Sequence, residues 1–320
     1  MKALQLLGGR SYQIVDLDLA EPGPEEVRVR IEAVTICTQW DLHLRSGEPM
    51  IPGHPFQFPY APGQPGHEAS GTIEAVGPEV RELVVGDRVS LWRDPGHHIQ
   101  GAYATHVVRP EHEVIRVPAH LAPSATAPVE LAMCLACSIQ LMAGSGLIRG
   151  KRLAVMGLGP AGLIAVQMFR AEGAAEVIGI DPVCKRREIA LRLGACAAYS
   201  PEEFRSSELA IDSALDCVGA KATVELLLDR VRDSVAIFGV LREDVKYKSS
   251  HFFRGVKLLG YPSHNREAAE YAVGLIEAGK LDLAPIISHH LPMDQYAEAI
   301  DLLETQEATK VCLYPNGLIV

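Results

Sequence analysis

Positive charge is the minority sign in this sequence, with 30 Lys and Arg residues against 40 Asp and Glu and a formal charge of −10 at pH 7. This balance gives no electrostatic attraction to nucleic acid or to an anionic membrane surface. No basic run with interleaved aromatic residues occurs, which further disfavours nucleic-acid binding. No uninterrupted apolar run approaches membrane-spanning length, and the N-terminus lacks the pattern of a secretory signal. We therefore expect a cytoplasmic protein that acts on a small molecule, with no nucleic acid or membrane as partner.

Cysteine is also sparse. The seven residues are odd in number and lie scattered at positions 37, 134, 137, 184, 196, 217 and 312. A disulfide framework would need a short, cysteine-dense chain, so most of these thiols are expected to be reduced and buried. Cys134 and Cys137 have redox spacing, but their apolar helical context favours two core thiols. The 320 residues are long enough for two domains with separate cores.

The chain changes character near Ala122. Before it, alternating stretches such as EEVRVRIEAV, GDRVSLW and GAYATHVVR lie between Gly and Pro turns and predict a compact antiparallel β domain. After it, strand-like and helix-like segments alternate, as in RLAVMGLGPAGLIAVQMFRAEGAAEVIGID at residues 152–181. That alternation predicts a parallel sheet with right-handed crossover helices. The fold class is therefore α/β.

A strand that runs into GLGPAG predicts a nucleotide site. The predicted turn comprises Gly157, Gly159, Pro160, Ala161 and Gly162. Such a turn permits close backbone approach to a pyrophosphate at the N-terminus of a helix. Asp181 ends the next strand, 19 residues after the last Gly, where it can accept hydrogen bonds from ribose hydroxyls. Its charge favours NAD over NADP, although the basic run at residues 185–187, with Arg186 at its centre, keeps NADP open.

Several sequence blocks, taken in order, resemble one family. They are EVRVRIEAVTIC, PGHEASGTIEAVG, VVGDRV, GAYATHVV, VELAMCLA, VMGLGPAG, DCVGA and ISHHLPMDQYAEAIDLL. Together they resemble the medium-chain dehydrogenase/reductase superfamily, and within it the zinc-dependent alcohol and polyol dehydrogenases of the sorbitol- or threonine-dehydrogenase type. The resemblance implies a β-rich GroES-like catalytic domain at residues 1–121 and 285–320. It also implies a Rossmann domain with a doubly wound parallel sheet at residues 122–284.

The resemblance also implies one catalytic zinc ion. Block by block, Cys37 and His67 match the first two zinc ligands, and Glu68 is the acid beside that His. Glu130 matches a position that is Cys or Glu in different branches. A thiolate, an imidazole and carboxylates suit Zn²⁺ with one open position. Members with a second, structural zinc carry four close cysteines after the GDRV strand, where this chain has none, so no structural zinc is expected.

The segment after Cys37 departs from the family pattern. The family has Ser or Thr two residues after the first ligand, but this chain carries Thr38 one residue after it and is one residue longer before Asp41 and His43. The proton can leave through Thr38, through Asp41 and His43, or through water.

Further along, the resemblance extends to cofactor loops. It implies nucleotide contacts at Cys217, Val218, Gly239 and Val240.

An insertion precedes the metal motif and adds His54, Phe56 and Phe58, which can shape a substrate pocket or only anchor their own loop. His97 and His98 are expected to be a surface pair. The resemblance implies a homodimer or homotetramer, usually formed at the edge of the Rossmann sheet.

The function implied is NAD- and zinc-dependent oxidation of a secondary alcohol, a polyol or sugar derivative, to a ketone by hydride transfer to the nicotinamide. The alternatives are a zinc-free NAD(P)H quinone or enone reductase on the same fold and a non-catalytic nucleotide-binding relative.

Overall fold

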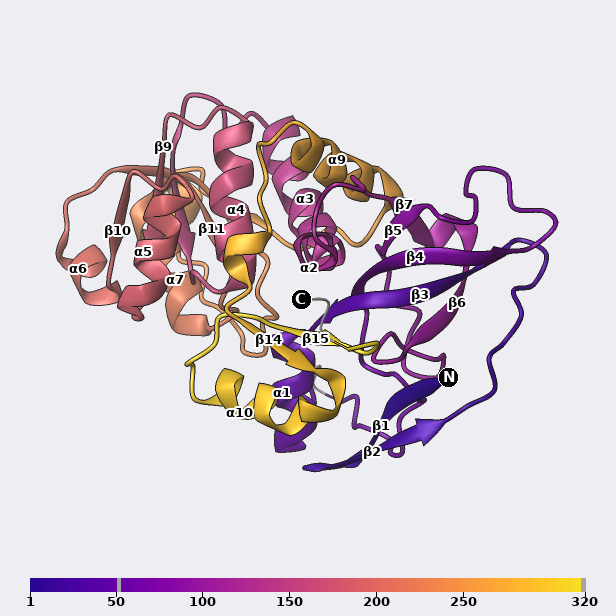
Figure 1. The fold of residues 1–320 in the computed structure, drawn as a ribbon. Coiled ribbons are helices and arrows are strands. Elements are labelled where there is room, and N and C mark those ends of the chain that lie inside the picture. The colour runs from indigo at the N-terminus through magenta and orange to yellow at the C-terminus, as the bar shows by residue number, and fades with distance from the viewer. Residues whose placement is uncertain (51–52, 318–320) are drawn as a thin grey trace. The chain divides into compact units, whose positions relative to one another are not determined.

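The computed structural model describes residues 1–50 and 53–317 (Figure 1). The chain divides into two compact units. The first consists of Met1–Leu131 together with the chain from Leu283 onward, and the second is Ala132–Asp282.

The first unit is built on a seven-stranded sheet. Its strands are β3 (Glu26–Thr35), β4 (Glu68–Val76), β5 (Arg88–Leu91), β6 (His106–Pro110), β7 (Val114–Arg116), β14 (His289–Pro292) and β15 (Val311–Tyr314). The order is β14-β15-β3-β4-β5-β7, and β6 pairs with β3. All pairings are antiparallel except β14 with β15. Because β15 pairs with β3, the two ends of the chain share one sheet and one core.

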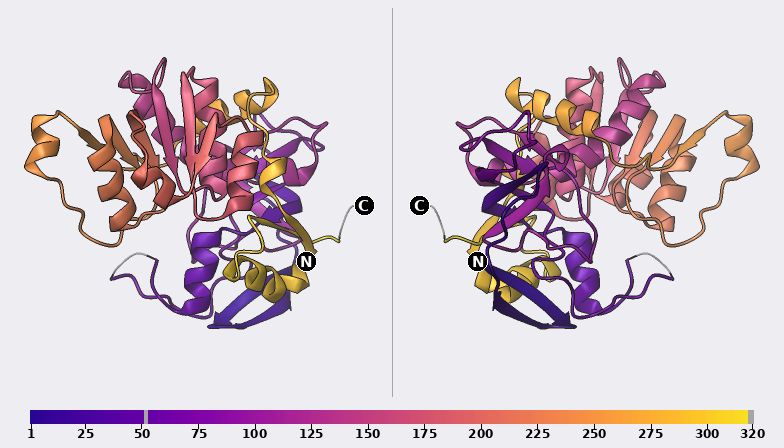
Figure 2. Two further views of the ribbon diagram at one scale, coloured as in Figure 1. Left: turned by 90° about the vertical axis from the view of Figure 1, so that its left-hand side faces the viewer. Right: turned by 90° about the vertical axis from the view of Figure 1, so that its right-hand side faces the viewer.

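The alternation of apolar and polar residues in EEVRVRIEAV matches the alternating burial of side chains along β3, where Val27, Val29 and Ile31 are fully buried. Every second side chain of a strand points to the same face, so this face packs into the core. A hairpin of β1 (Lys2–Gly8) and β2 (Ser11–Asp16) lies beside α10 (Tyr296–Glu304) in both views of Figure 2. Tyr12 of the hairpin packs edge-on against Tyr296 of the helix, with ring centroids 5.4 Å apart.

Short helices complete the first unit. They are α1 (Thr38–Ser46), α2 (Pro123–Thr126) and the 3₁₀ turns η1 (Glu111–Glu113), η2 (Ala284–Ile286) and η3 (Met293–Gln295). The long helix α3 (Val129–Gly144) begins in this unit and continues into the second. The stretch Pro123–Gly144 is long and apolar enough to cross a membrane by length and composition, but most of it is buried inside the protein. Core helices of soluble proteins have the same properties, so this is weak evidence of a span.

The second unit is a six-stranded parallel sheet in the order β10-β9-β8-β11-β12-β13. Its strands are β8 (Arg152–Met156), β9 (Glu176–Ile180), β10 (Ala197–Tyr199), β11 (Ile211–Asp216), β12 (Val231–Ile237) and β13 (Lys257–Leu259). Its other helices are α4 (Pro160–Ala171), α5 (Cys184–Arg192), α6 (Pro201–Ser206), α7 (Lys221–Arg230), α8 (Ser249–Phe253) and α9 (Arg266–Glu277). Counted from β8, the order is 3-2-1-4-5-6, which is the doubly wound order of dinucleotide-binding domains. The predicted α/β fold class is confirmed.

Candidate functional site

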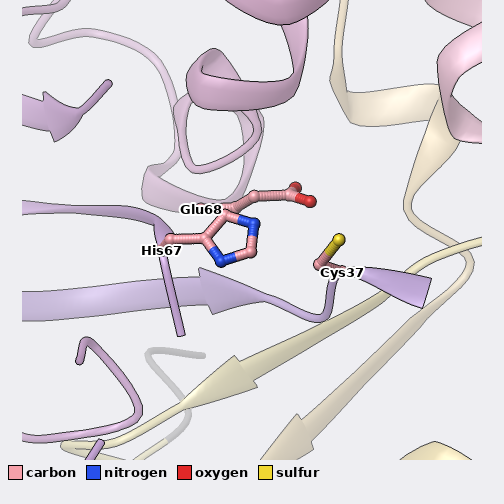
Figure 3. Close-up of side chains that lie close together, drawn as sticks. All are labelled: Cys37, His67 and Glu68. Carbon is pink, nitrogen blue, oxygen red and sulfur yellow. The ribbon is translucent and has the colours of Figure 1, made fainter. Parts of the chain in front are cut away.

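Cys37 lies where β3 gives way to α1. It is the N-cap residue of α1, and its side chain makes no capping hydrogen bond, so the sulfur is not committed to the helix end. The Cys37 sulfur, a His67 ring nitrogen and a Glu68 carboxylate oxygen all lie within 4.8 Å of one another (Figure 3). His67 and Glu68 are buried and Cys37 is half-buried. Three ligating atoms of different chemistry therefore converge in the first unit.

The PGHE turn aims His67 at this cluster. The turn can pass closely over the 101–103 segment because Gly66 has no side chain: a Cβ there would lie 2.4 Å from the backbone nitrogen of Tyr103. His67 Nδ1 is 2.6 Å from the carbonyl oxygen of Pro65. A carbonyl only accepts, so Nδ1 carries a proton and donates it, and Nε2 is the ring nitrogen that can bind a metal once it has given up its own proton.

Negative groups surround the His67 ring. Glu130, in the first turn of α3, places Oε2 3.9 Å from His67 Nε2, and Glu130 is itself buried. Burial lowers the pKa of His67, but the nearby Glu130 and Cys37 raise it, and the pKa stands well above its ordinary value. A buried site that stabilises positive charge on an imidazole also favours a metal cation. The donor set of Cys, His and carboxylate fits Zn²⁺.

Glu68 begins β4 and faces a cation from the far end of the chain. The Lys310 ammonium, just before β15, lies 2.9 Å from Oε1 and 2.7 Å from Oε2 of Glu68. The Thr35 hydroxyl donates to Oε2 at 2.7 Å, and Lys310 also donates to the carbonyl oxygen of Ile36 at 3.0 Å. Both oxygens of Glu68 are thus engaged. Its charge is balanced by Lys310 from the side of β15.

The segment after Cys37 places Asp41 in the core. Its carboxylate accepts hydrogen bonds from the hydroxyls of Tyr103 at 3.0 Å and Tyr296 at 2.6 Å. Burial raises the pKa of Asp41 to about 6, although both tyrosines act to lower it. His43 Nδ1 lies 3.0 Å from the carbonyl oxygen of Glu48.

Thr38 offers an uncommitted hydroxyl beside Cys37. Its Oγ1 is buried and has no hydrogen-bond partner among residues 1–50 and 53–317. A buried polar atom usually finds a partner, so this hydroxyl is available to one supplied from outside the chain.

The predicted nucleotide turn joins β8 to α4 in the second unit. A Cβ on Gly162 would lie 1.8 Å from the carbonyl oxygen of Gly157, so only glycine permits this approach of helix to turn. Gly159 is the N-cap of α4 and Pro160 begins the helix, with Ala161 in its first turn. The α4 N-terminus thus offers unpaired backbone N–H groups and a positive dipole end to an anion.

Asp181 follows β9 and is buried. One carboxylate oxygen accepts from the backbone N–H of Leu158 at 2.7 Å, and the other from Val183 at 2.8 Å. The Arg186 guanidinium lies 3.8 Å from Asp181 Oδ2. Asp181 therefore holds the glycine turn through the hydrogen bond from Leu158, and the Arg186 guanidinium lies beside its carboxylate.

The remaining predicted contacts lie on two neighbouring loops. Cys217 and Val218 follow β11, while Gly239 and Val240 follow β12. Asp216 organises the first loop by accepting from the backbone N–H of Gly219 at 2.7 Å. A ligand of an open parallel sheet binds at its carboxyl end where the order reverses, here between β8 and β11. The predicted residues come together at that edge of the second unit.

Known families match both parts of the chain. Residues 23–119 match the alcohol dehydrogenase GroES-like domain, and residues 160–278 match the zinc-binding dehydrogenase family. L-threonine 3-dehydrogenase of Pyrococcus horikoshii is 28% identical over 341 residues, covering 95% of each chain. The chain belongs to the zinc-type medium-chain dehydrogenases/reductases.

Solved structures of this family superpose on 98% of the chain. A protein of Sinorhizobium meliloti described as a zinc-binding dehydrogenase, bound to NADP, has a TM-score of 0.85 and 26% identity, with 98% of this chain and 99% of that one covered. An alcohol dehydrogenase of Aeropyrum pernix has a TM-score of 0.83 and 25% identity over 98% and 100% of the chains. The predicted family, GroES-like and Rossmann-type fold and CH–OH oxidoreductase class are confirmed. Family membership also supports zinc, a nicotinamide nucleotide and a small-molecule substrate. The individual site residues keep the status of predictions.

Sequence reasoning missed several residues of this dehydrogenase. Lys310, Thr35, Tyr103 and Tyr296 were not singled out, although they hold Glu68 and Asp41. Lys310 carried one usable signal, since a Lys next to the apolar strand VCLY is expected to need a buried partner.

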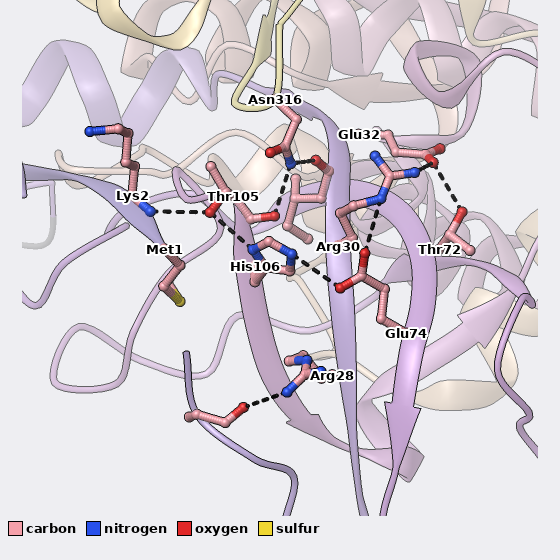
Figure 4. Close-up of polar contacts among 12 residues, drawn as sticks. Met1, Lys2, Arg28, Arg30, Glu32, Thr72, Glu74, Thr105, His106 and Asn316 are labelled. Carbon is pink, nitrogen blue, oxygen red and sulfur yellow. Dashed lines mark hydrogen bonds and ion pairs between the residues drawn. The ribbon is translucent and has the colours of Figure 1, made fainter. Parts of the chain in front are cut away.

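A second polar cluster of the dehydrogenase is a ladder across β3, β4 and β6 (Figure 4). Arg30 bridges Glu32 and Glu74, and Glu74 also pairs with His106 at 3.1 Å. Burial lowers the pKa of His106, which Arg28 lowers further while Glu74 raises it. These groups satisfy one another across adjacent strands, so the ladder supports the sheet. The side chain of Asn316 donates to the carbonyl oxygen of Ile31 at 2.8 Å and to that of Thr105 at 3.0 Å, which ties the tail to the same sheet.

Proposed function

We propose that this chain is a zinc- and NAD-dependent dehydrogenase that oxidises a secondary alcohol, a polyol or sugar derivative, to a ketone. The observation that carries the proposal is the convergence of Cys37, His67 and Glu68 within 4.8 Å, with Glu130 facing His67. The relatives named L-threonine 3-dehydrogenase support a secondary alcohol as the group oxidised.

Cys37, His67 and Glu130 are the proposed zinc ligands. Glu68 is proposed to position the ligands without binding zinc itself, because Lys310 and Thr35 already engage both oxygens of its carboxylate. Zinc, when bound, supplies a Lewis acid that lowers the pKa of the substrate hydroxyl. The Nδ1–H donation of His67 to Pro65 holds the ring in the tautomer that ligation needs.

Thr38 is the proposed first acceptor of the substrate proton, because its buried hydroxyl has no partner among the described residues. Asp41 is proposed as a positioning residue. Two tyrosine hydroxyls hold its carboxylate under α1, so it anchors the turn that carries Cys37 and Thr38. His43 is the proposed next group along the proton route.

The nucleotide is proposed to bind at the β8–α4 turn, where its nicotinamide, when bound, supplies the hydride acceptor. The α4 N-terminus would hold the pyrophosphate, and Asp181 at the end of β9 would favour the ribose hydroxyls of NAD. Arg186 lies beside Asp181 and would admit NADP as a weaker cofactor.

We also propose a cytoplasmic homodimer or homotetramer. The strand β13 stands at the end of the parallel sheet, and an unpaired strand edge can pair with another chain. Sedimentation velocity on the purified chain measures the state directly.

The decisive test combines metal analysis with activity. The zinc-loaded protein is expected to hold one zinc per chain at the proposed site and to reduce NAD with a secondary alcohol. Cys37→Ala is expected to lose both, whereas the control Cys184→Ala, at an exposed cysteine, keeps both. Full activity of Cys37→Ala without metal contradicts the proposal. So does NADPH-driven reduction of an activated alkene in the presence of a chelator, with no alcohol oxidised.

A further inference from the structure

A cavity of about 410 Å³ lies in the first unit, next to α1. Its size is that of a small-molecule site. Half-buried Trp40 and Phe56 and buried Tyr60 form its inner wall, and exposed His54, His97 and His98 form its rim. Apolar ring faces therefore lie deep, and groups that donate and accept hydrogen bonds lie at the mouth.

Four rings follow one another around this cavity. Trp40 and Phe56 have centroids 6.3 Å apart, and Phe56 and Tyr60 are 6.4 Å apart. Tyr60 and His97 are 5.9 Å apart, and His97 returns to Trp40 at 5.5 Å. The interplanar angles run from 51° to 69°, so the rings tilt and do not stack on one another. Phe56 and Tyr60 also contact Phe58, so the inserted loop is anchored by its own aromatic residues.

Two walls of the cavity come from the chain segments that also carry candidate zinc ligands. Trp40 lies in the first turn of α1, three residues after the N-cap residue Cys37. Tyr60 belongs to the segment that leads into the His67 turn. The segments that carry the candidate ligands Cys37 and His67 thus also supply the aromatic rings of Trp40 and Tyr60.

The third wall is tied to the same turn. The Gln64 side chain donates to the carbonyl oxygens of Gly96 and Ile99, each at 3.0 Å, and so holds the loop that presents His97 and His98.

We propose that this cavity binds the ring of a cyclic, polyhydroxylated alcohol, whose secondary hydroxyl is oxidised at the Cys37–His67 centre. The inference rests on the proposed dehydrogenase function. The C–H face of such a ring is apolar and packs on aromatic faces, while its hydroxyls pair with imidazoles at the rim. A short acyclic alcohol would leave most of this volume unfilled. A metal is a poorer occupant, because no group of three close ligands among the described residues includes a rim imidazole.

The test compares two six-carbon, six-hydroxyl substrates that differ in ring closure, myo-inositol and D-sorbitol. Zinc-loaded full-length protein with saturating NAD is expected to oxidise myo-inositol with at least tenfold higher kcat/KM than D-sorbitol or L-threonine. Trp40→Ala and His97→Ala are expected to lower kcat/KM for myo-inositol about tenfold and that for 2,3-butanediol less than about twofold. The exposed His120→Ala is the matched control and is expected to change neither.

The outcomes separate the two proposals. Oxidation of 2,3-butanediol with no preference for the ring, or equal losses for all substrates in both variants, overturns the ring-binding inference alone. Failure of the zinc-loaded protein to oxidise any of these alcohols overturns the proposed function and the inference with it. His97 is exposed, so His97→Ala carries the test even if Trp40→Ala does not fold.

Discussion

Lys310 and Glu68 form an ion pair that is almost fully buried, with the ammonium 2.9 Å from one carboxylate oxygen and 2.7 Å from the other. The pair joins the residue just before β15 to the residue just after His67, across a separation of 242 positions. The ion pair therefore connects the place where β15 joins the seven-stranded sheet to Glu68 in the candidate metal centre.

Removing the cation of this pair is expected to destabilise the protein strongly. Lys310→Met leaves the Glu68 carboxylate buried without its partner, which costs about 3–5 kcal/mol of unfolding free energy. Urea unfolding of the chelator-treated protein measures the loss. The double variant Glu68→Gln with Lys310→Met should recover much of it, and the exposed Lys221→Met serves as control. A loss below about 1 kcal/mol in Lys310→Met would contradict the role assigned to the pair.

Glu130 and Glu68 are expected to respond differently to the same substitution. Glu130→Gln removes a proposed zinc ligand, so zinc should be lost on dialysis against a moderate chelator. Glu68→Gln should retain one zinc per chain but release it about 10–100-fold more readily, as is typical when a group behind the ligands is changed. Zinc content by mass spectrometry checks both variants. Retention by Glu130→Gln with loss from Glu68→Gln would reverse the two assignments.

Asp41 is expected to give the apoprotein a pH-dependent stability. Its folded-state pKa of about 6 lies above its ordinary value, so between about pH 4 and pH 6 the folded chain binds this proton more tightly than the unfolded chain. Stability from this group is therefore greatest below about pH 4 and falls as the pH rises to about 6, by about 3 kcal/mol in all. Asp41→Asn should abolish this slope and unfold at higher urea than wild type at pH 8, measured with chelator present. The control Asp18→Asn, at an exposed residue, should keep the slope.

Arg186 is expected to set how well NADP competes with NAD. Without its guanidinium, Asp181 would repel a 2′-phosphate more strongly, so Arg186→Ala should lower kcat/KM for NADP about tenfold. The value for NAD should change less than about threefold. Arg192→Ala, exposed at the end of the same helix, is the matched control. Equal losses with both cofactors would show that Arg186 holds the fold and does not discriminate.

Gly162 is expected to tolerate no side chain. The Cβ of Gly162→Ala would meet the Gly157 carbonyl oxygen at 1.8 Å, and that oxygen belongs to the backbone, so the turn must move. NAD binding measured by calorimetry should be lost, with lower thermal stability. Gly274→Ala lies on helix α9, where an added Cβ would meet no described atom within 4 Å apart from its own helix backbone and its chain neighbours, so it should bind NAD normally and be slightly more stable. Normal NAD binding by Gly162→Ala would place the nucleotide elsewhere.

Much of the fold and the nucleotide turn could be predicted because their signals are local. The alternation in β3 and the strand, glycine turn, helix and acid of residues 152–181 each lie within a short window, where backbone geometry dictates residue type. The Cys37 and PGHE blocks, by contrast, were recognisable through their resemblance to the dehydrogenase family.

The tertiary structure alone decided what surrounds those residues. Asp41 meets Tyr296 across 255 positions, and Glu68 meets Lys310 across 242. The ring of Trp40, Phe56 and His97 likewise joins three separate segments. Partners of this kind are set by strand pairing and core packing, which bring distant side chains together without leaving a periodic or spaced pattern in the chain.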